Sequence, residues 1–354
     1  MDIFFTVCFY LITMVLTCFF TKKAVDKNDI RWLLIPVILL SLVAGLRSFD
    51  VGTDTHRVVQ SIEYTYEKGI FSHSKEYIYY FLCKFLMIIW KNPSFVLTVF
   101  ALITNALVFI RLWDFKDNIN IVVATSIYFL FYFGLSMNIV RQCMAIAIVF
   151  YATRFIEKKN YKFYFLGVFI AFLVHISSCV AIVIPVIYLF FEGKLSAIKQ
   201  INKKYIFIVV TICIVLGSFL IYKYAGYFSE FSLNIGLMQT VCLLLLLGSY
   251  FLIYMNKEKI MKSKSLENDF ENLRTVYYVA LLGHVIAFLG YMVPALGRLG
   301  YTFKLFEIVY YGMLMKKSFY SNVVKASIYG MLLLLGFYSF MTYGGIVPYA
   351  FIGG

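Results

Sequence analysis

Residues 3–20 read IFFTVCFYLITMVLTCFF, an apolar stretch without a charged side chain. As an α-helix it is about 27 Å long at ~1.5 Å per residue, close to the ~30 Å thickness of a bilayer's hydrocarbon core. The stretch therefore predicts a transmembrane helix. The lysines Lys22, Lys23 and Lys27 follow it and do not precede it. We therefore expect an uncleaved first helix whose N-terminus lies outside the cytoplasm.

Similar apolar blocks recur along all 354 residues. They cover residues 3–20, 32–46, 77–90, 94–113, 119–135, 137–156, 162–174, 178–191, 205–225, 236–255, 275–295, 301–315 and 323–343. With 62% hydrophobic and only 14% charged residues, the chain has too few polar side chains to cover a soluble globule. The pattern excludes a soluble enzyme. It predicts an all-α, polytopic transmembrane bundle that forms one integral membrane domain over residues 1–354, without a soluble domain.

The basic residues orient this bundle. The formal net charge is +14, and the most basic connections are residues 22–31, 158–162, 194–204, 257–264 and 316–325. The positive-inside rule assigns all five to the cytoplasm, so the excess charge does not require a nucleic acid partner. Five apolar blocks lie between the first two connections, where an even number of crossings is needed, and block 77–90 is short and contains Lys84. We therefore predict about 12 spans plus one interfacial or re-entrant helix at 77–90. The longest connections are an outer loop at 47–76 and a cytoplasmic loop at 256–274.

Cysteine spacing indicates no metal or disulfide chemistry. Seven cysteines lie in or beside apolar blocks, and none has a Cys-x-x-Cys or Cys–His spacing. We expect free thiols, no metal and no cofactor.

Four arginines, Arg47, Arg57, Arg141 and Arg298, are predicted on the outer side, where the positive-inside rule does not explain them. Arg47 opens the segment 47–55, RSFDVGTDT, in which Gly52 permits a tight turn. Asp54 in this segment is suited to orient an arginine or to act as a base. The alternative for Arg47 is a surface ion pair with Asp50 or Asp54, of little energetic weight.

A second outer motif is NIVRQ at residues 138–142. On a continuous helix, Asn138, Arg141 and Gln142 have i, i+3 and i+4 spacing, so we expect them to share one face and converge on one spot. The planar guanidinium of Arg141 suits phosphate oxygens, and the two amides add neutral donors. The alternative is an arginine that extends to the membrane interface.

The third and fourth outer motifs are AFLVHIS at residues 171–177 and PALGRLGY at residues 294–301. His175 lies at a predicted hinge between two short helices, and an imidazole there can accept a proton near neutral pH. A structural histidine is the alternative. Arg298 stands between two glycines, which let a backbone approach a ligand closely.

Other polar residues lie inside apolar blocks. Lys304 and Glu307 are predicted to form an intramembrane ion pair. Asn105 and Gln239 are predicted to form hydrogen bonds between helices. His284, with no polar neighbour at helical spacing, is interpreted as structural.

The four outer motifs occur in an order that resembles the Wzy-type oligosaccharide repeat-unit polymerases of the EpsG-like family. The residues that carry this resemblance are Arg47 with 51–55, Asn138 with Arg141, Gln142 and Ala145, Ala171 with His175 and Ser177, and Pro294 with Arg298 and Tyr301. Arg57 departs from the family pattern, which has an aromatic residue there. Each motif alone is weakly specific, but the ordered set covers nearly the whole chain.

The resemblance implies a GT-C-like membrane glycosyltransferase. Such an enzyme polymerises undecaprenyl diphosphate-linked oligosaccharide repeat units on the outer face of the bacterial cytoplasmic (inner) membrane, for capsular polysaccharide, exopolysaccharide or O-antigen. Its expected partners are the lipid-linked donor and acceptor, membrane lipids, a flippase and a chain-length regulator. A transporter or flippase of lipid-linked oligosaccharides, an O-antigen ligase-like enzyme and a non-enzymatic scaffold subunit remain as alternatives.

The resemblance also suggests roles for individual residues. Arg47, Arg141 and Arg298 are expected to bind the diphosphate, where preorganised positive charge stabilises the leaving group without a metal. His175 is the expected base, with Asp54 as the alternative. The supporting residues are Gly52, Thr53, Asn138, Gln142, Ser177 and Tyr301.

Overall fold

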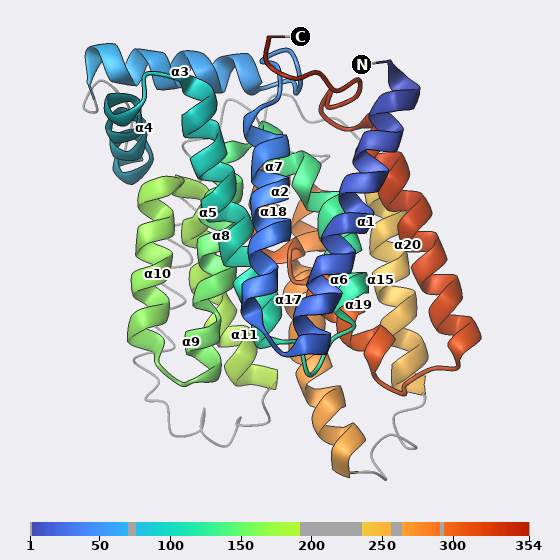
Figure 1. The fold of residues 1–354 in the computed structure, drawn as a ribbon. Coiled ribbons are helices and arrows are strands. Elements are labelled where there is room, and N and C mark those ends of the chain that lie inside the picture. Colours follow the sequence, from blue (N-terminus) through green and yellow to red (C-terminus); the bar gives the residue numbers. More distant parts are fainter. Residues whose placement is uncertain (1, 70–75, 192–235, 256–263, 291–293, 354) are drawn as a thin grey trace. The chain divides into compact units, whose positions relative to one another are not determined.

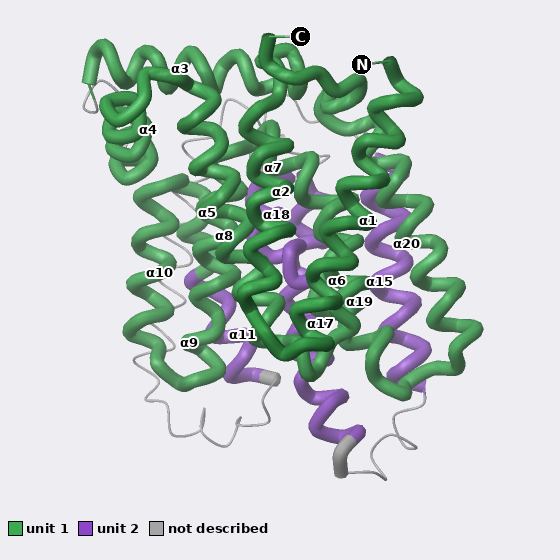
Figure 2. Tube along the Cα trace, in the orientation of Figure 1, with its two compact units in different colours: residues 1–181, 307–354 green, residues 182–306 purple. Residues whose placement is uncertain are grey.

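The computed structural model describes residues 2–69, 76–191, 236–255, 264–290 and 294–353 (Figure 1). The chain divides into two units, which are described separately (Figure 2). Unit 1 comprises residues 1–181 and 307–354, and unit 2 comprises residues 182–306. The predicted block at 205–225 and the basic connections at 194–204 and 257–264 fall almost wholly outside the described residues.

Unit 1 is helical. Its α-helices are α1 (Ile3–Lys27), α2 (Leu34–Gly45), α3 (Thr55–Lys68), α4 (Tyr77–Ile89), α5 (Pro93–Asp114), α6 (Ile121–Ile127), α7 (Gly134–Asn138), α8 (Val140–Ala152), α9 (Arg154–Glu157), α10 (Tyr161–Val174), α19 (Glu307–Lys316) and α20 (Asn322–Thr342). A 3₁₀ turn, Ile30–Leu33, leads into α2, and a π-helical stretch, Tyr128–Phe133, joins α6 to α7.

The described part of unit 2 is also helical. It contains α11 (Ile184–Phe191), α15 (Leu237–Met255), α17 (Lys264–Leu289) and α18 (Pro294–Lys304). The 3₁₀ segment Ile176–Val183 begins in unit 1 and ends in unit 2.

Six described helices are long and apolar enough to cross a membrane: Ile3–Lys27, Pro93–Asp114, Ile121–Asn138, Leu237–Met255, Leu266–Leu289 and Asn322–Thr342. Four shorter apolar helices accompany them: Ile30–Gly45, Tyr77–Ile89, Tyr161–Val174 and Ile176–Phe190. For the described residues, these findings confirm the prediction of a helical membrane protein, with six candidate spans. The helix at 77–89 is among the short ones, as its length in the sequence indicates.

Four local features differ from the sequence prediction. The predicted cytoplasmic loop 256–274 is helical from Lys264, where α17 begins. The loop 47–76 contains the amphipathic helix α3, whose buried residues Thr55, Val59, Ile62 and Thr65 follow helical spacing. The block 301–315 is divided, because α18 ends at Lys304 and α19 begins at Glu307. Finally, Ile139 leaves helical geometry, with φ −91° and ψ 56°, so α7 and α8 are separate helices.

Helix α1 shows how a membrane helix packs with its polar side inward. Thr13, Thr17 and Thr21 are buried, and each hydroxyl donates a hydrogen bond to the carbonyl four residues earlier. Phe4 and Val15 are more than half exposed. Since the helix satisfies its own hydroxyls, its small polar face can pack against the protein while its apolar face meets lipid.

The C-terminal segment folds back onto the segment that follows α2. The amides of Ser48, Gly52 and Thr53 donate to the carbonyls of Ala350, Gly345 and Gly344, at 2.7, 3.0 and 2.9 Å. Tyr349, buried in this segment, donates its hydroxyl to the carbonyl of Val43 at 2.9 Å. We call the segment 46–54, between α2 and α3, the Gly-Thr-Asp loop. These bonds fix it at the end of unit 1 where both chain termini lie (Figure 1).

Candidate functional site

Arg47 is a buried structural hub of the Gly-Thr-Asp loop, with 1% of its surface exposed. Its guanidinium donates hydrogen bonds to the carbonyls of Ala44, Val51 (3.3 Å) and Met137 (2.6 Å) and to the hydroxyl of Thr55 (3.3 Å). Burial lowers the pKa of Arg47 to about 10, which leaves it charged at neutral pH. Arg47 therefore joins the end of α2, the loop and the end of α7.

Neither surface pair considered for Arg47 is present. Asp50 accepts a hydrogen bond from Ser48 and lies 2.9 Å from Nε2 of His56. The Asp54 carboxylate lies 3.8 Å from Arg57. The side chain of Arg57 is 84% exposed, so Arg57 is a surface residue.

Asn138, the last residue of α7, binds the same loop through its side chain. Its Oδ1 accepts hydrogen bonds from the Thr53 hydroxyl at 3.3 Å and from the Asp54 amide at 3.4 Å. Gly52 has φ +97°, and a Cβ there would lie 2.9 Å from Asn138 Oδ1. The position therefore requires glycine both for its backbone conformation and for this close approach. The predicted roles of Gly52, Thr53 and Asn138 as supporting residues have a geometric basis in this contact.

Arg141 and His175 meet at a carboxylate that the sequence analysis did not single out, that of Glu76. Nδ1 of His175 lies 2.5 Å from one Glu76 oxygen, and Nη1 of Arg141 lies 2.8 Å from the other. The amide of Ile176 donates to Glu76 at 3.3 Å. We call Glu76, Arg141 and His175 the carboxylate cluster. All three belong to unit 1.

The carboxylate cluster combines a buried carboxylate with a more accessible imidazole and guanidinium. The side chain of Glu76 is 7% exposed, whereas those of His175 and Arg141 are 21% and 36% exposed. Burial alone would raise the pKa of Glu76, but its hydrogen bond with His175 and the charges of His175 and Arg141 lower the pKa below its ordinary value. Glu76 precedes α4 and lies outside the six long spans. Because its pKa is lowered, its carboxylate is ionised at neutral pH.

Two tyrosines of α4 frame Arg141. The Tyr80 hydroxyl accepts a hydrogen bond from Nη1 at 2.7 Å, and the guanidinium carbon lies 5.3 Å from the centre of the Tyr79 ring. Both hydrogen bonds that the structure describes for this guanidinium leave from Nη1. Nη2 and Nε are thus directed to no described protein acceptor, which is the arrangement that a ligand with oxygen acceptors requires.

The predicted convergence of Asn138, Arg141 and Gln142 is wrong. Because Ile139 interrupts the helix, Asn138 faces the Gly-Thr-Asp loop, while Arg141 faces Glu76. Gln142 is buried, with 3% exposure. Because of this break, Asn138 contacts the Gly-Thr-Asp loop and Arg141 contacts Glu76 in the carboxylate cluster.

The remaining predicted site residues lie elsewhere. Ser177 lies two residues after His175 in the sequence and is buried. Its hydroxyl has no hydrogen-bond partner among the described residues. Arg298 and Tyr301 lie on α18 of unit 2, where Arg298 is exposed. In the same helix, Gly300 lies against Gly283 of α17, since a Cβ there would be 2.6 Å from the Gly283 carbonyl oxygen.

The predicted hydrogen bonds between helices are confirmed. The Asn105 amide donates to Ser41 at 3.2 Å, and its carbonyl oxygen accepts from Tyr128 at 2.7 Å. Within unit 2, Gln239 lies 3.0 Å from His284 and accepts a hydrogen bond from Lys304 at 2.9 Å.

The structure adds described partners to two of the polar residues inside apolar blocks. His284 has a polar neighbour from another helix, Gln239. Glu307 accepts a hydrogen bond from Tyr132 at 2.6 Å, within unit 1. The ion pair of Lys304 with Glu307 stays a prediction.

Within the described residues, no group of three or more His, Cys, Asp and Glu side chains is arranged to hold a metal ion. The six cysteines in the described residues are free thiols. Cys213 lies outside the described residues. The carboxylate cluster itself offers a carboxylate, an imidazole and a guanidinium.

Comparison with known protein families matches residues 30–351, nearly the whole chain, to the EpsG family. The chain belongs to the EpsG family. EpsG-like proteins are Wzy-type polymerases, so the resemblance carried by the four outer motifs is confirmed, and with it a general role as a polysaccharide polymerase. No match was found among curated proteins or among solved structures. Family membership also implies lipid-linked oligosaccharides as substrates in general terms.

The lowered pKa of Glu76 predicts a pH dependence of stability. Glu76→Gln removes an ionised group whose native pKa is below its unfolded value, so the native carboxylate stabilises the fold at neutral pH. That contribution is complete above the ordinary glutamate pKa of ~4.3 and is lost as the pH falls through the lowered native value. We expect Glu76→Gln to lower the Tm at pH 7 and the difference to shrink only below about pH 4.

The matched control for this measurement is Glu67→Gln, on the exposed side of α3. Its Tm should stay close to that of the wild type at each pH. A Glu76→Gln variant as stable as the wild type at pH 7 would contradict the electrostatic description of the cluster.

Proposed function

We propose that this EpsG-family protein polymerises undecaprenyl diphosphate-linked oligosaccharide repeat units on the outer face of the cytoplasmic membrane. The observation that carries the proposal is the carboxylate cluster, which joins a positioned imidazole to a partly free guanidinium. A glycosyl transfer from a diphosphate needs a base for the acceptor and a cation for the leaving group. The cluster supplies both within one site.

In the proposed reaction, a hydroxyl oxygen of the acceptor sugar attacks the anomeric carbon of the donor glycan. The new carbon–oxygen bond forms as the bond from that carbon to the diphosphate oxygen breaks. The hydroxyl proton passes to Nε2 of His175, and the bond electrons leave with undecaprenyl diphosphate. Glu76 holds the proton on Nδ1, which leaves the lone pair on Nε2 available as the base.

Arg141 is the proposed ligand of the diphosphate, through Nη2 and Nε. Arg298 is proposed as a further diphosphate ligand, an assignment that rests on the family motif at 294–301. Arg47, as a buried hub, is proposed to act by holding the Gly-Thr-Asp loop, so that Asp54 is available as the alternative base or as an orienting group. Gln142, Ser177 and Tyr301 are proposed as supporting residues.

The finer features of the architecture are part of the same proposal. They are a GT-C-like bundle of about 12 spans, one integral membrane domain and location in the bacterial inner membrane. The product would be a capsular polysaccharide, an exopolysaccharide or an O-antigen, formed without a metal. A flippase that delivers repeat units and a regulator of chain length are the proposed protein partners.

The polymerase proposal is tested with purified protein and lipid-linked repeat units extracted from cells that lack it. We expect a ladder of glycans that differ by one repeat unit. Movement of the repeat units across a vesicle membrane without a ladder would indicate a transporter. Transfer to lipid A without further extension would indicate a ligase. Either result would contradict the proposal.

The outer location predicts which residues an impermeant reagent reaches. In a cysteine-free variant, the exposed position Thr53→Cys should react with a membrane-impermeant maleimide in intact cells. Lys158→Cys, exposed in the basic connection between α9 and α10, should react only after permeabilisation. The reverse pattern would place the Gly-Thr-Asp loop in the cytoplasm and overturn the orientation.

A further inference from the structure

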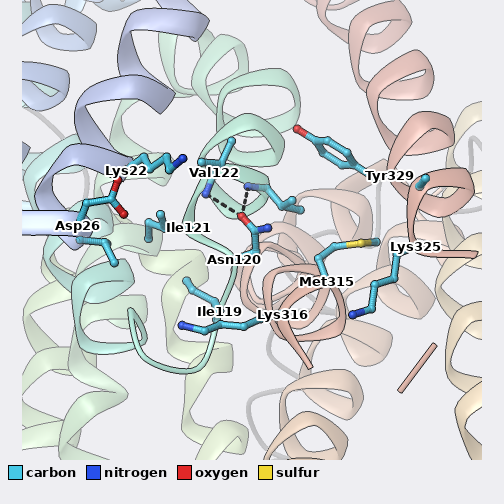
Figure 3. Close-up of a pocket in the computed structure, with 13 residues that line it drawn as sticks. Lys22, Asp26, Ile119, Asn120, Ile121, Val122, Met315, Lys316, Lys325 and Tyr329 are labelled. Carbon is cyan, nitrogen blue, oxygen red and sulfur yellow. Dashed lines mark hydrogen bonds between the residues drawn. The ribbon is translucent and has the colours of Figure 1, made fainter. Parts of the chain in front are cut away.

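A groove of about 610 Å³ lies in unit 1, among helices that carry no part of the carboxylate cluster (Figure 3). It is lined by the ends of α1 and α19, the start of α20 and the residues at the start of α6. Helix α6 contacts α1, α19 and α20, so it forms the floor between them. This volume is in the range of small-molecule sites in proteins, ~300–1,000 Å³.

The floor of the groove is mostly apolar. Ile119, Ile121, Val122 and Val123 line it, together with Asn120, whose Oδ1 accepts hydrogen bonds from the amides of Val122 and Val123. Deeper along α6, Ser126 lies 3.0 Å from the Tyr329 hydroxyl of α20, and this contact ties the two helices together. The groove therefore has a mostly apolar floor between helices that a polar contact holds together.

The rim of the groove is basic. Lys22 of α1, Lys316 of α19 and Lys325 of α20 surround it, together with one carboxylate, Asp26 (Figure 3). Three lysines and one aspartate give the lining a net charge of +2. Lys316 donates one hydrogen bond to the Lys116 carbonyl at 2.9 Å, and an ammonium group has two further donors.

The groove lies where an amphiphile would place its headgroup. Lys22 and the 316–325 connection belong to the basic segments that the positive-inside rule assigns to the cytoplasm. Away from this end, α1 and α20 expose apolar side chains, among them Phe19 (56% exposed) and Leu334 (74% exposed). A ligand with an anionic head and apolar chains satisfies the basic rim and these helix surfaces together.

We propose that this groove binds the headgroup of an anionic phospholipid of the cytoplasmic leaflet, such as phosphatidylglycerol. Lysines act as compact point charges, which suit a single phosphodiester, whereas the planar fork of arginine favours bidentate phosphate recognition. No arginine lines the groove, and Asp26 would repel a second phosphate group. A phosphodiester lipid therefore fits better than a diphosphate carrier.

The test measures lipid binding to the full-length protein in nanodiscs of zwitterionic lipid, with phosphatidylglycerol added in steps. The double variant Lys22→Gln/Lys325→Gln removes two rim charges and leaves the Lys316 contact intact. At ~1 kcal/mol per lysine, reduced by salt screening, we expect its Kd for phosphatidylglycerol to rise about tenfold. The matched control is Lys158→Gln/Lys162→Gln, two exposed lysines in another basic connection, and its Kd should stay near the wild-type value.

A second variant keeps every charge. Ala326→Trp places a large side chain at the exposed mouth of the groove and is expected to weaken phosphatidylglycerol binding, with an unchanged Tm as evidence of folding. Three results would overturn the proposal. They are equal losses in the rim and control double variants, equal wild-type affinity for phosphatidylglycerol and phosphatidylethanolamine, and displacement of phosphatidylglycerol by sub-stoichiometric undecaprenyl phosphate or diphosphate.

Discussion

Replacement of His175 by alanine is expected to lower the rate of glycan transfer by about 10²–10⁴-fold, the usual contribution of a general base. The reason is geometric. Nδ1 of His175 is committed to Glu76 at 2.5 Å, so the proton of the acceptor hydroxyl would be taken by Nε2, which alanine lacks. The measurement is the initial rate of ladder formation at saturating lipid-linked substrate.

His56 provides the matched control for this prediction. It is also a histidine paired with a carboxylate, Asp50, but its side chain is 62% exposed and it lies outside the carboxylate cluster. We expect His56→Ala to retain the wild-type rate, and added imidazole to restore part of the activity of His175→Ala. Equal rates for the two variants would show that His175 is not the base and would favour Asp54.

Replacement of Arg47 by methionine is expected to destabilise the protein by about 3–5 kcal/mol, because it removes a buried charge and the four hydrogen bonds that it donates. The carbonyls of Ala44, Val51 and Met137 would each lose the donor that Arg47 supplies. The measurement is the free energy of unfolding, or the Tm, of the purified protein in detergent.

Arg57→Met is the control for Arg47, since Arg57 is exposed in the same region. Its stability should change by less than about 0.5 kcal/mol. The comparison also distinguishes two roles for Arg47. A variant that keeps the wild-type Tm but loses activity would identify Arg47 as a diphosphate ligand and would contradict its proposed role in holding the loop.

Much of the helical architecture could be predicted from the sequence, because apolar blocks of about 14–20 residues have few alternatives to a helix in lipid. Helices α5 and α20 lie within one residue of their predicted limits, whereas α1 continues to Lys27, beyond its predicted end at residue 20. The amphipathic helix α3 was missed because its buried stripe includes threonines. Hydrophobicity alone does not distinguish such a stripe from a polar loop.

Two residues of the carboxylate cluster, Arg141 and His175, could be predicted from the sequence. Glu76 could not, because the interactions that join it to them are long-range. Glu76 is 65 residues from Arg141 and 99 from His175, so no local spacing links them. The available signal was a carboxylate directly before an apolar helix that is too short to span. Asn138 and Arg141 illustrate the converse, since their local spacing predicts a shared face that the break at Ile139 removes.

The charge pattern predicts the direction of the chain but does not distinguish the roles of individual arginines. Of the arginines predicted on the outer side, three lie in unit 1, where Arg57 is a surface residue, Arg47 is a buried hub and Arg141 belongs to the cluster. All three have the same residue type and the same predicted side of the membrane. Their burial and partners, which depend on tertiary packing, separate them.

The most direct test of the central claim is the ratio of carrier released to bonds formed. Purified protein is supplied with repeat units on radiolabelled undecaprenyl diphosphate, and free carrier and glycan length are measured in the same samples. We predict that one undecaprenyl diphosphate is released for each repeat unit joined, and that His175→Ala and Arg141→Ala lower both quantities together. Chain extension without release of the carrier, or equal release and extension in both variants and the wild type, would contradict it.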